Sequence, residues 1–456
     1  MLDFLQSLIA FIFALGLLIT FHEFGHYWVA RRCDVKILRF SLGFGRPVYK
    51  RLFGTDNSEF VIAALPLGGY VKMLDEREGP VAEEELPRAF NNKPVGQRIA
   101  IAAAGPVFNF IFAVSAYWLM FMVGVPGLKP AIGAVADNSM ALQAGLKAGD
   151  EIIEVDAQPT PTWSSVIDIF VADVIAGRQV RLLVKTERGS ERYVDINLGR
   201  ISVDNMAGGD LLALLGLTPA YPQVKPIIRK VQGNSVAERA GLQGGDQLLS
   251  ADGKTITNAA DWVKYIQEHA QQAVEVEVLR SGQRQRLTMT PLLVANENGQ
   301  WVGRVGVIVY DQTVEPNKLA ATQAYTVGAA LVKSLDRTLE MSLMTLRVLG
   351  KMITGEASVR NLSGPISIAH YAGQSAGLGL GIFLGFLAVV SLSLGVLNLL
   401  PIPLLDGGHL LYYLVEVVKG SPVSESLQSI GQQVGLVILI GLMGIAFYND
   451  IIRLLG

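Results

Sequence analysis

Four long runs of apolar residues divide the chain into membrane-spanning and polar parts. They cover approximately residues 4–30, 99–124, 377–400 and 430–448, and the last run is the shortest. A helix needs about 20 apolar residues to cross a bilayer, and these runs lie close to that length or above it. The pattern therefore predicts a polytopic α-helical membrane protein with four transmembrane helices.

The first apolar run is expected to stay in the protein as a helix rather than serve as a signal peptide. Residues 1–6 carry Asp3 and neither lysine nor arginine. The run is also longer than the core of an ordinary signal peptide, and it contains the sequence His-Glu-x-x-His. We therefore interpret it as a retained transmembrane helix.

The basic residues that follow this run predict how the helices cross the membrane. They are Arg31, Arg32, Lys36, Arg39 and Arg46. Because lysine and arginine are enriched in cytoplasmic loops, the first helix is expected to run from outside to inside. The next three helices then run outward, inward and outward. The polar stretch from about 127 to 315 is consequently expected outside the cytoplasm.

This polar stretch contains an internal repeat. The segment from Asn138 to Asp150 reappears from Asn234 to Asp246, 96 residues later, with Asn-Ser, Ala-Gly-Leu and Gly-Asp in common. Each copy continues into an apolar strand, a turn, a helix-like segment and a pair of alternating strands. We expect two small β-rich domains in tandem.

Each copy resembles a PDZ domain of the circularly permuted bacterial type, in which Ala-Gly-Leu-x-x-Gly-Asp joins a short helix to a strand. The resemblance implies a groove between a strand and a helix that accepts an extended peptide or the C-terminus of another protein. The alternative is that both domains are spacers that bind nothing.

Two further segments predict elements beside the membrane helices. Residues 38–75 are apolar and rich in glycine, which favours β-hairpins lying against or dipping into the membrane, provided that protein, a cavity or a substrate satisfies the backbone. Residues 329–349 show apolar positions at helical spacing with five charges between them. This pattern suits a helix in the outer membrane interface or an ordinary helix that packs against a domain.

Composition narrows the class of protein. Half of the 456 residues are hydrophobic and 17% are charged, while the net charge of −2 gives no reason to expect nucleic-acid binding. The single cysteine, Cys33, excludes an internal disulfide. We expect a membrane part at 1–126, PDZ-like domains at 127–221 and 222–315, an amphipathic helix with a linker at 316–375, and a second membrane part at 376–456.

The sequence His22-Glu23-Phe24-Gly25-His26 indicates a metal centre. Residues i and i+4 share one face of a helix, so both imidazoles can reach one metal ion while Glu23 addresses a water beside it. Ionisable residues inside a membrane helix are costly, so function is the default explanation. The alternative is a buried polar patch that packs helices or relays protons.

A catalytic zinc ion usually takes three protein ligands and a water. The first and third helices are expected to run in the same direction, which brings Asp406, just after the third helix, to the depth of His22 and His26. Pro401 and Pro403 break that helix, and the following glycines let the backbone turn. Three rival ligands are His409, Cys33 and His370.

The two motifs together resemble the signature of site-2 intramembrane zinc metalloproteases. These enzymes carry His-Glu-x-x-His in the first helix and Asn-x-x-Pro-x-Pro-x-Leu-Asp-Gly in the third, and the resemblance extends from end to end with the PDZ-like repeats between. The resemblance implies Zn²⁺ held by His22, His26 and Asp406, with Glu23 as the catalytic acid and base. It also implies a membrane hairpin at Gly43, Phe44 and Gly45, and a Gly-Pro-x-x-Asn element at Gly105, Pro106 and Asn109, close to the site.

The sequence as a whole resembles the members of this family from Gram-negative bacteria, which implies a place in the inner membrane. Such members cut the helix of an anti-sigma factor after a first protease has trimmed its periplasmic side, and some clear remnant signal peptides. The resemblance therefore implies single-span membrane proteins as substrates and the envelope stress response as the setting. The expected topology places the PDZ-like domains in the periplasm and the active site near the cytoplasmic side of the membrane.

Several polar residues have two interpretations. Asn398 and Asn109 are amides in apolar helices, able to hold a substrate backbone or an oxyanion, or to form an ordinary interhelix hydrogen bond. Pro401 and Pro403 are further substrate-binding candidates. For the whole protein, the rivals to a protease are a non-catalytic PDZ scaffold and a metal transporter.

Overall fold

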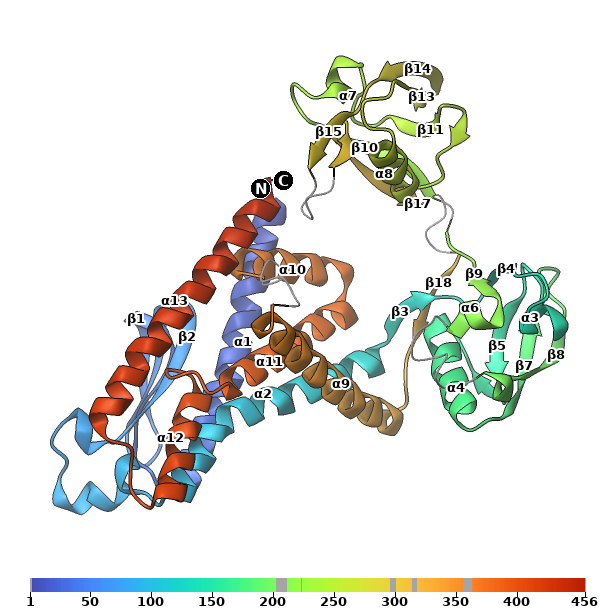
Figure 1. The fold of residues 1–456 in the computed structure, drawn as a ribbon. Coiled ribbons are helices and arrows are strands. Elements are labelled where there is room, and N and C mark those ends of the chain that lie inside the picture. Colours follow the sequence, from blue (N-terminus) through green and yellow to red (C-terminus); the bar gives the residue numbers. More distant parts are fainter. Residues whose placement is uncertain are drawn as a thin grey trace. The chain divides into compact units, whose positions relative to one another are not determined.

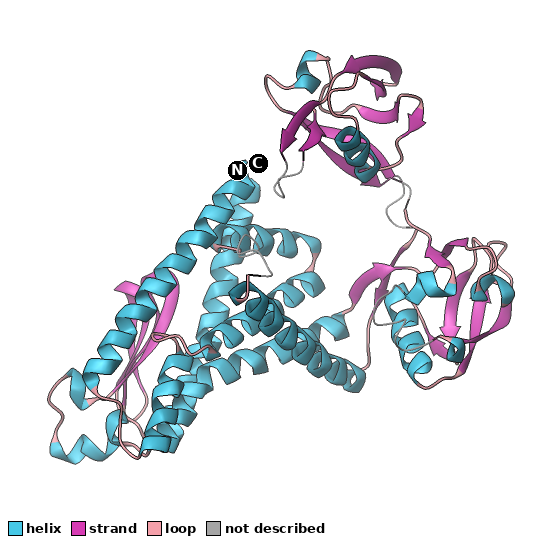
Figure 2. Cartoon of the chain, viewed as in Figure 1, coloured by secondary structure: helices cyan, strands magenta, loops and turns pink. Residues whose placement is uncertain are grey.

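The computed structural model describes residues 2–201, 211–222, 224–295, 301–313, 318–355 and 363–455. The protein forms two compact units, the first from Met1–Val125 with Gln323–Gly456 and the second from Pro126–Thr322. Figure 1 traces the backbone through both units, and Figure 2 shows that helices dominate the first and strands the second. The boundary predicted between 315 and 316 lies outside the described residues.

Four helices of the first unit are long and apolar enough to cross a membrane. They are α1 (Leu2–Arg32), α2 (Val95–Val123), α11 (Leu380–Leu399) and α13 (Glu425–Leu455), so the prediction of four such helices is confirmed. The prediction that the last one is the shortest is wrong, because α13 has 31 residues and α11 has 20. Polar residues such as Gln428 and Gln432 end the apolar run without interrupting the helix.

Helix α2 is the central element of this unit. It packs against α1, α11 and α9 (Val327–Ile353), and small residues allow the close approach. A Cβ atom on Gly25 of α1 would lie 2.5 Å from the carbonyl oxygen of Ala104. A Cβ atom on Gly395 of α11 would lie 3.3 Å from the carbonyl oxygen of Pro106. Side chains on α2 thus meet residues of both neighbouring helices.

Strands β1 (Ile37–Phe53) and β2 (Ser58–Met73) form a sheet beside α1, where strands were predicted (Figure 1). The two are long and bend, so β1 pairs with β2 twice. Phe40 lies opposite both Val71 and Phe60 in the register. Among the described residues, no third strand pairs with this sheet, so Gly69–Met73 is paired on one side by Ile37–Leu42 and is an edge. The loop beyond contains the short helices η1 (Glu76–Glu78), η2 (Glu83–Arg88) and η3 (Phe90–Asn92).

The described part of the first unit contains three more α-helices. The helix predicted at 329–349 is present as α9, and α10 (Pro365–Leu378) and α12 (Asp406–Lys419) flank α11. The side of α9 that is buried carries small residues, Ala330, Ser334 and Thr338. Its apolar stripe instead faces outward, with Leu335 52% and Leu339 62% exposed.

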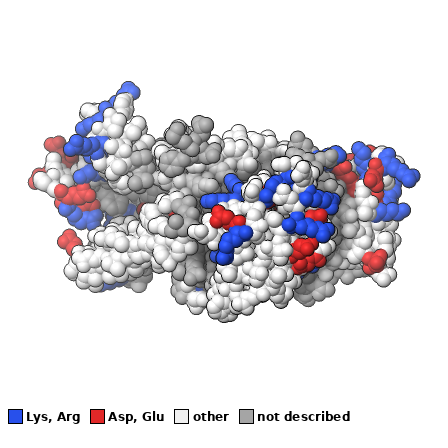
Figure 3. All heavy atoms as spheres, turned by 90° about the horizontal axis from the view of Figure 1, so that it is seen from above, with Lys and Arg blue, Asp and Glu red and all other residues white. Residues whose placement is uncertain are grey.

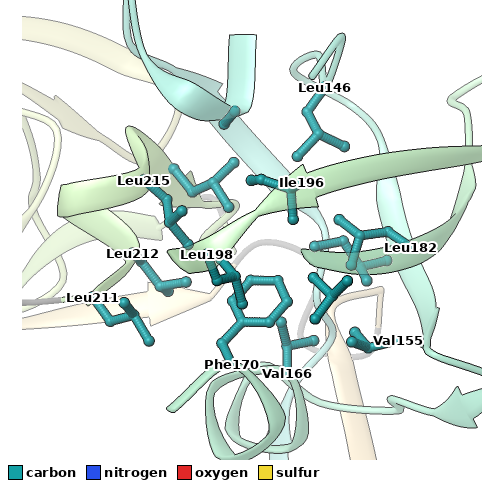
Figure 4. Close-up of a cluster of buried hydrophobic side chains, with 14 of the residues drawn as sticks. Leu146, Val155, Val166, Phe170, Leu182, Ile196, Leu198, Leu211, Leu212 and Leu215 are labelled. Carbon is teal, nitrogen blue, oxygen red and sulfur yellow. The ribbon is translucent and has the colours of Figure 1, made fainter. Parts of the chain in front are cut away.

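The second unit contains the predicted repeat. Its first copy begins with β4 (Ile132–Val135), α3 (Met140–Gln143) and β5 (Glu151–Val155). It continues through β6 (Gln158–Pro159), α4 (Trp163–Ile175), β7 (Gln179–Lys185), β8 (Glu191–Asn197), η4 (Leu198–Arg200), α6 (Leu211–Leu215) and β9 (Leu217–Pro219). Figure 4 shows its core, in which Phe170 of α4 lies among aliphatic side chains from the strands and α6.

The second copy repeats this order of elements. It comprises β10 (Val224–Val231), α7 (Val236–Arg239), β11 (Gln247–Ala251), β12 (Lys254–Thr255), α8 (Ala259–Glu268), β13 (Val274–Arg280) and β14 (Gln283–Met289). Three further strands follow, β15 (Leu292–Ala295), β16 (Trp301–Arg304) and β17 (Val307–Thr313), and β17 pairs with β10. Trp262 and Ile266 of α8 are buried in the core of this copy.

The Ala-Gly-Leu-x-x-Gly-Asp segments have the same structural role in both copies. Asp150 is 4% exposed and accepts a hydrogen bond from Arg192 at 2.7 Å. Asp246 is 1% exposed and accepts from Arg280. A buried carboxylate requires such a partner. The final aspartate of each motif therefore has a structural role in holding its neighbouring loop, and this role accounts for it without a catalytic function. Short strands β3 (Val125–Leu128) and β18 (Ala320–Gln323) pair where the backbone enters and leaves the second unit.

Charged side chains are unevenly distributed. On the face drawn in Figure 3 they lie in groups separated by broad uncharged areas. Helix α13 exposes apolar side chains along its length, among them Val437 at 71% and Ile440 at 62%. Such continuous apolar exposure is abnormal for a protein in water and is expected for helices that face lipid.

Candidate metal centre

The first two candidate ligands lie on the C-terminal half of α1, one helical turn apart. The apolar run that makes α1 a helix carries His22 and His26 on one face. Their ring centroids are 4.9 Å apart, and their Nε2 atoms are 3.3 Å apart. Both imidazoles therefore present the same nitrogen to one point in space.

Asp406 reaches that point from a sharp turn. Helix α11 ends at Leu399, the backbone bends through Pro401 and Pro403, and α12 begins at Asp406. Leu404 has a φ of 86°, and a Cβ atom on Gly408 would lie 2.6 Å from the carbonyl oxygen of Ile402, so the turn needs glycine there. The Asp406 carboxylate lies 3.2 Å from His22 Nε2 and 3.5 Å from His26 Nε2.

These three side chains suit a zinc ion. Their ligand atoms all lie within 4.8 Å of one another, and two imidazoles with one carboxylate are a common ligand set of catalytic zinc. The Asp406 carboxylate faces the Nε2 atoms of both histidines, so one ion could bind all three side chains.

Helix α2 covers the other side of the two imidazoles. A Cβ atom on Gly105 would collide with His26 Nε2 and would lie 2.6 Å from His22 Cε1, so only glycine fits there. His26 Nδ1 lies 2.8 Å from the carbonyl oxygen of Ile101. That carbonyl can only accept, so Nδ1 carries the proton and Nε2 is free to bind a metal. Asn109 lies 3.1 Å from His22 Nδ1.

Glu23 lies beside the ligands, against the edge of the sheet. Val71 of β2 lines the same cavity as Glu23. A Cβ atom on Gly69 would lie 2.9 Å from Glu23 Cγ, so the strand passes this side chain at contact distance. Glu23 does not belong to the ligand group of His22, His26 and Asp406.

A cavity of about 1210 Å³ opens onto these residues. Its walls include His22, Glu23, His26 and Asp406, the edge of β2 from Gly69 to Met73, Asn398, and several charged or polar residues of the loops and α13. The side chain of His409 also lines it, but His409 is not in the ligand group. Neither are Cys33 and His370 in that group, within the residues that the structure describes.

The remaining predicted substrate-binding residues do not line this cavity themselves. Gly43 and Gly45 have φ values of 94° and 89°, and the ring of Phe44 stacks on Tyr70, which lines the cavity, with centroids 6.1 Å apart. Gly43–Gly45 does not itself contribute to the cavity wall. Pro403 contacts α13, where a Cβ atom on Gly435 would collide with its carbonyl oxygen.

Sequence reasoning missed several cavity residues. Arg98 and Glu416 form an ion pair at 2.5 Å and join the start of α2 to α12, with both side chains mostly buried. Gln428 and Gln432 of α13 line the same cavity. The sequence signal for Gln428 and Gln432 is an amide in an otherwise apolar helix. An amide that faces lipid is costly, so such residues are expected to face protein or a cavity.

Comparison with known proteins gives one family. A sequence model of peptidase family M50 matches residues 10–442. The regulator of sigma-E protease RseP of Escherichia coli (strain K12) is 44% identical over 457 residues, covering 100% of both proteins. Protease RseP of Yersinia pestis is 41% identical over 457 residues, again covering 100% of both.

Among solved structures, this protein is similar to the PDZ domain of the SdrC-like protein from Listeria monocytogenes. The match covers 20% of this protein and 92% of the PDZ domain, with 15% identity and a TM-score of 0.17. A TM-score of this size carries no argument about the repeats.

Proposed function

The protein belongs to peptidase family M50 and is an intramembrane metalloprotease. We propose that His22, His26 and Asp406 hold one zinc ion and that Glu23 is the catalytic acid and base. The observation that carries the proposal is the convergence of three ligand side chains within 4.8 Å, beside helices able to cross a membrane.

A zinc ion bound by these side chains would act as a Lewis acid that lowers the pKa of water toward neutral and polarises a peptide carbonyl. The protein's part is to hold the ligands and to move a proton. Asp406 and the Nε2 atoms of His22 and His26 are oriented before any substrate arrives, because each is fixed by contacts with α2 or with the turn before α12. Such preorganisation avoids rearrangement during the reaction.

Glu23 moves the proton. Its carboxylate lies one residue from His22 on the helix and faces the cavity without joining the ligand group. It accepts a proton from the attacking water and returns it to the amine that leaves. The edge of β2 packs against Glu23, since a Cβ atom on Gly69 would lie 2.9 Å from its Cγ atom, and this contact limits where the carboxylate can turn.

The edge of β2 positions the peptide. A helical substrate hides its carbonyl groups in hydrogen bonds, so the segment to be cut must unwind. Gly69–Met73 is an edge in the described sheet and lines the cavity, so it can pair with an extended segment by strand addition. Asn398 lines the same cavity and holds the segment by its amide. Pro401 and Pro403 shape the turn that follows it, while Phe44, between Gly43 and Gly45, supports Tyr70 of the strand.

The substrates we propose are single-span proteins of the bacterial inner membrane. The relatives are named as regulators of sigma-E, which favours an anti-sigma factor already trimmed by a first protease, and remnant signal peptides are further substrates. The excess of basic residues after α1 supports an active site near the cytoplasmic side and PDZ-like repeats on the periplasmic side. Peptide C-termini are the ligands that such repeats would bind.

Replacing Glu23 with Gln tests the proposal. Glu23→Gln should retain zinc at the parental level and lose cleavage of a trimmed single-span substrate by about 10²–10⁴-fold, because only proton transfer is removed. Glu78→Gln is the matched control, since Glu78 lines the same cavity and is exposed. Parental cleavage by a zinc-loaded Glu23→Gln variant would show that another group is the base. Loss of zinc in that variant would make Glu23 a ligand.

A further inference from the structure

Asn109 is a buried amide on α2 that faces a metal ligand instead of the cavity. Its exposure is 0%, and it does not line the cavity. Its Nδ2 atom is placed 3.1 Å from His22 Nδ1, while its Oδ1 atom is buried without a hydrogen-bond partner among the described residues. A buried carbonyl oxygen without a partner costs about 1–3 kcal/mol and requires an explanation.

The orientation of this amide follows from the state of His22. When Nε2 of a neutral imidazole binds a metal, the proton must be on Nδ1. Nδ1–H and an amide N–H₂ are both donors and cannot bond to each other. The oxygen and nitrogen of an amide have nearly the same shape, so their assignment depends on their partners. Turned by 180°, the Asn109 amide places Oδ1 at the atom position that is 3.1 Å from Nδ1.

The surrounding helices leave Asn109 no other partner of this kind among the described residues. Ser391 of α11 donates to the Asn109 backbone carbonyl at 2.8 Å, and a Cβ atom on Gly395 would lie 3.3 Å from Asn109 Cβ. This packing buries the amide between helices, where a substrate peptide has no room. On the neighbouring ligand, the Ile101 carbonyl has the equivalent position at His26 Nδ1.

We infer that Asn109 is a positioning residue that accepts the Nδ1–H hydrogen bond of His22 through its side-chain oxygen. This contact fixes the imidazole in the tautomer whose free Nε2 faces His26 and Asp406. Helix α2 then orients both histidines, one through a side chain and the other through a backbone carbonyl. The inference rests on the proposed zinc site and assigns a function in metal binding, separate from substrate contact.

Zinc affinity of the full-length protein in detergent, measured by competition with a chelating dye, tests this function. Asn109→Leu keeps the approximate shape and removes the acceptor, and it should weaken zinc binding by about 10–100-fold, the usual effect of losing such a partner. Asn109→Asp keeps an oxygen at the same position and should restore affinity to near the parental value. Ser391→Ala is the control, because it removes a hydrogen bond from the same helix contact without touching His22, and its zinc affinity should match the parent.

Each other outcome overturns the inference. Parental zinc affinity in Asn109→Leu with cleavage lost would assign Asn109 to the substrate. Equal loss of affinity in Asn109→Leu, Asn109→Asp and Ser391→Ala would reduce its role to helix packing. Failure of the parental protein to bind zinc would instead refute the proposed function, so the two failures are distinguishable.

Discussion

The side chains around each ligand decide how well a metal can bind. Gly105 lies so close to both imidazoles that any larger residue would displace them. The Ile101 carbonyl fixes the tautomer of His26, and the turn before α12 holds the Asp406 carboxylate beside both imidazoles. A helix with the His-Glu-x-x-His pattern alone would leave both rings free to rotate. The site therefore depends on α2 as much as on the residues that bind the metal.

Replacing Asp406 and His409 separately tests which of the two is the third metal ligand. Asp406→Ala should bring the zinc content of the purified protein close to zero, because catalytic zinc with two protein ligands is weakly held. His409→Ala should retain about one zinc per protein molecule, because His409 lies outside the ligand group. Metal analysis after dialysis against a chelator measures both. Zinc retained in Asp406→Ala and lost in His409→Ala would reverse the assignment.

The sequence predicts side chains at this site better than it predicts backbone groups. His22, Glu23, His26 and Asp406 carry motif signals, and the structure brings them together. Ile101 contributes a backbone carbonyl oxygen, and Gly69–Met73 offers the backbone groups of a strand edge. Nearly every residue has these groups, so no residue type identifies them before the fold is known.

Among the elements, the contact between β2 and α1 is the most sensitive. Gly69 has no free volume, because a Cβ atom there would lie 2.7 Å from Ile19 Cγ2, 2.9 Å from Glu23 Cγ and 2.9 Å from the Ser41 carbonyl oxygen. Protein interiors cannot absorb such overlaps without moving. The strand and the helix thus fix the place of the general base together.

Gly69→Ala should therefore impair catalysis without removing the metal. The added methyl group pushes Glu23 and β2 apart, and a displacement of about 1 Å can reduce the cleavage rate by about 10²-fold. Zinc content should stay at the parental level, because the three atoms nearest to the added methyl group belong to Ile19, Glu23 and Ser41, none of them a proposed ligand. Gly96→Ala in the first turn of α2 has open space around its Cβ position and serves as the control. Undiminished cleavage by zinc-loaded Gly69→Ala would mean that β2 is free to move away.

Hydrophobic periodicity locates helices well but can mislead about their faces. It predicts α9, yet the apolar stripe it detects is exposed, and the buried side is made of Ala330, Ser334 and Thr338. Small residues allow close packing against α2 and α11, and a lipid surface can cover the large ones. The apolar run at 430–448 also underestimates the length of α13. Polar residues continue this helix on both sides of the run, from Glu425 to Leu455.

For the whole molecule, orientation in the membrane determines which compartment each part meets. Labelling of single cysteines in a Cys33→Ser background tests it. Arg188→Cys, in the exposed turn between β7 and β8, should react with an impermeant maleimide in intact spheroplasts, while Glu84→Cys, in the loop between α1 and α2, should react only after lysis. The reverse pattern would invert the topology, and with it the side on which the site lies.

In the proposed topology the repeats affect cleavage through access to the site. That topology places them on the periplasmic side, after α2, and places the proposed metal ligands of α1 and of the start of α12 near the cytoplasmic side, so that a hydrocarbon layer about 30 Å thick separates the two. Residues of the repeats can then supply neither a ligand nor a base. Two folded domains near the entrance would exclude a substrate that still carries its own outer domain, and admit one that is already trimmed.

Removal of the repeats tests this idea, and the structure shows where to cut. Strands β3 and β18 pair, and the Lys129 amide donates to the Leu319 carbonyl at 2.8 Å, so a short Gly-Ser linker can replace residues 130–318. The shortened protein should bind zinc, cleave the trimmed substrate at about the parental rate, and also cleave the untrimmed form. Glu23→Gln in the same background is the control for cleavage by other proteases. A zinc-loaded, folded deletion that no longer cuts the trimmed substrate would show that the repeats recruit substrates, because a filter that only excludes cannot be needed by a substrate it admits.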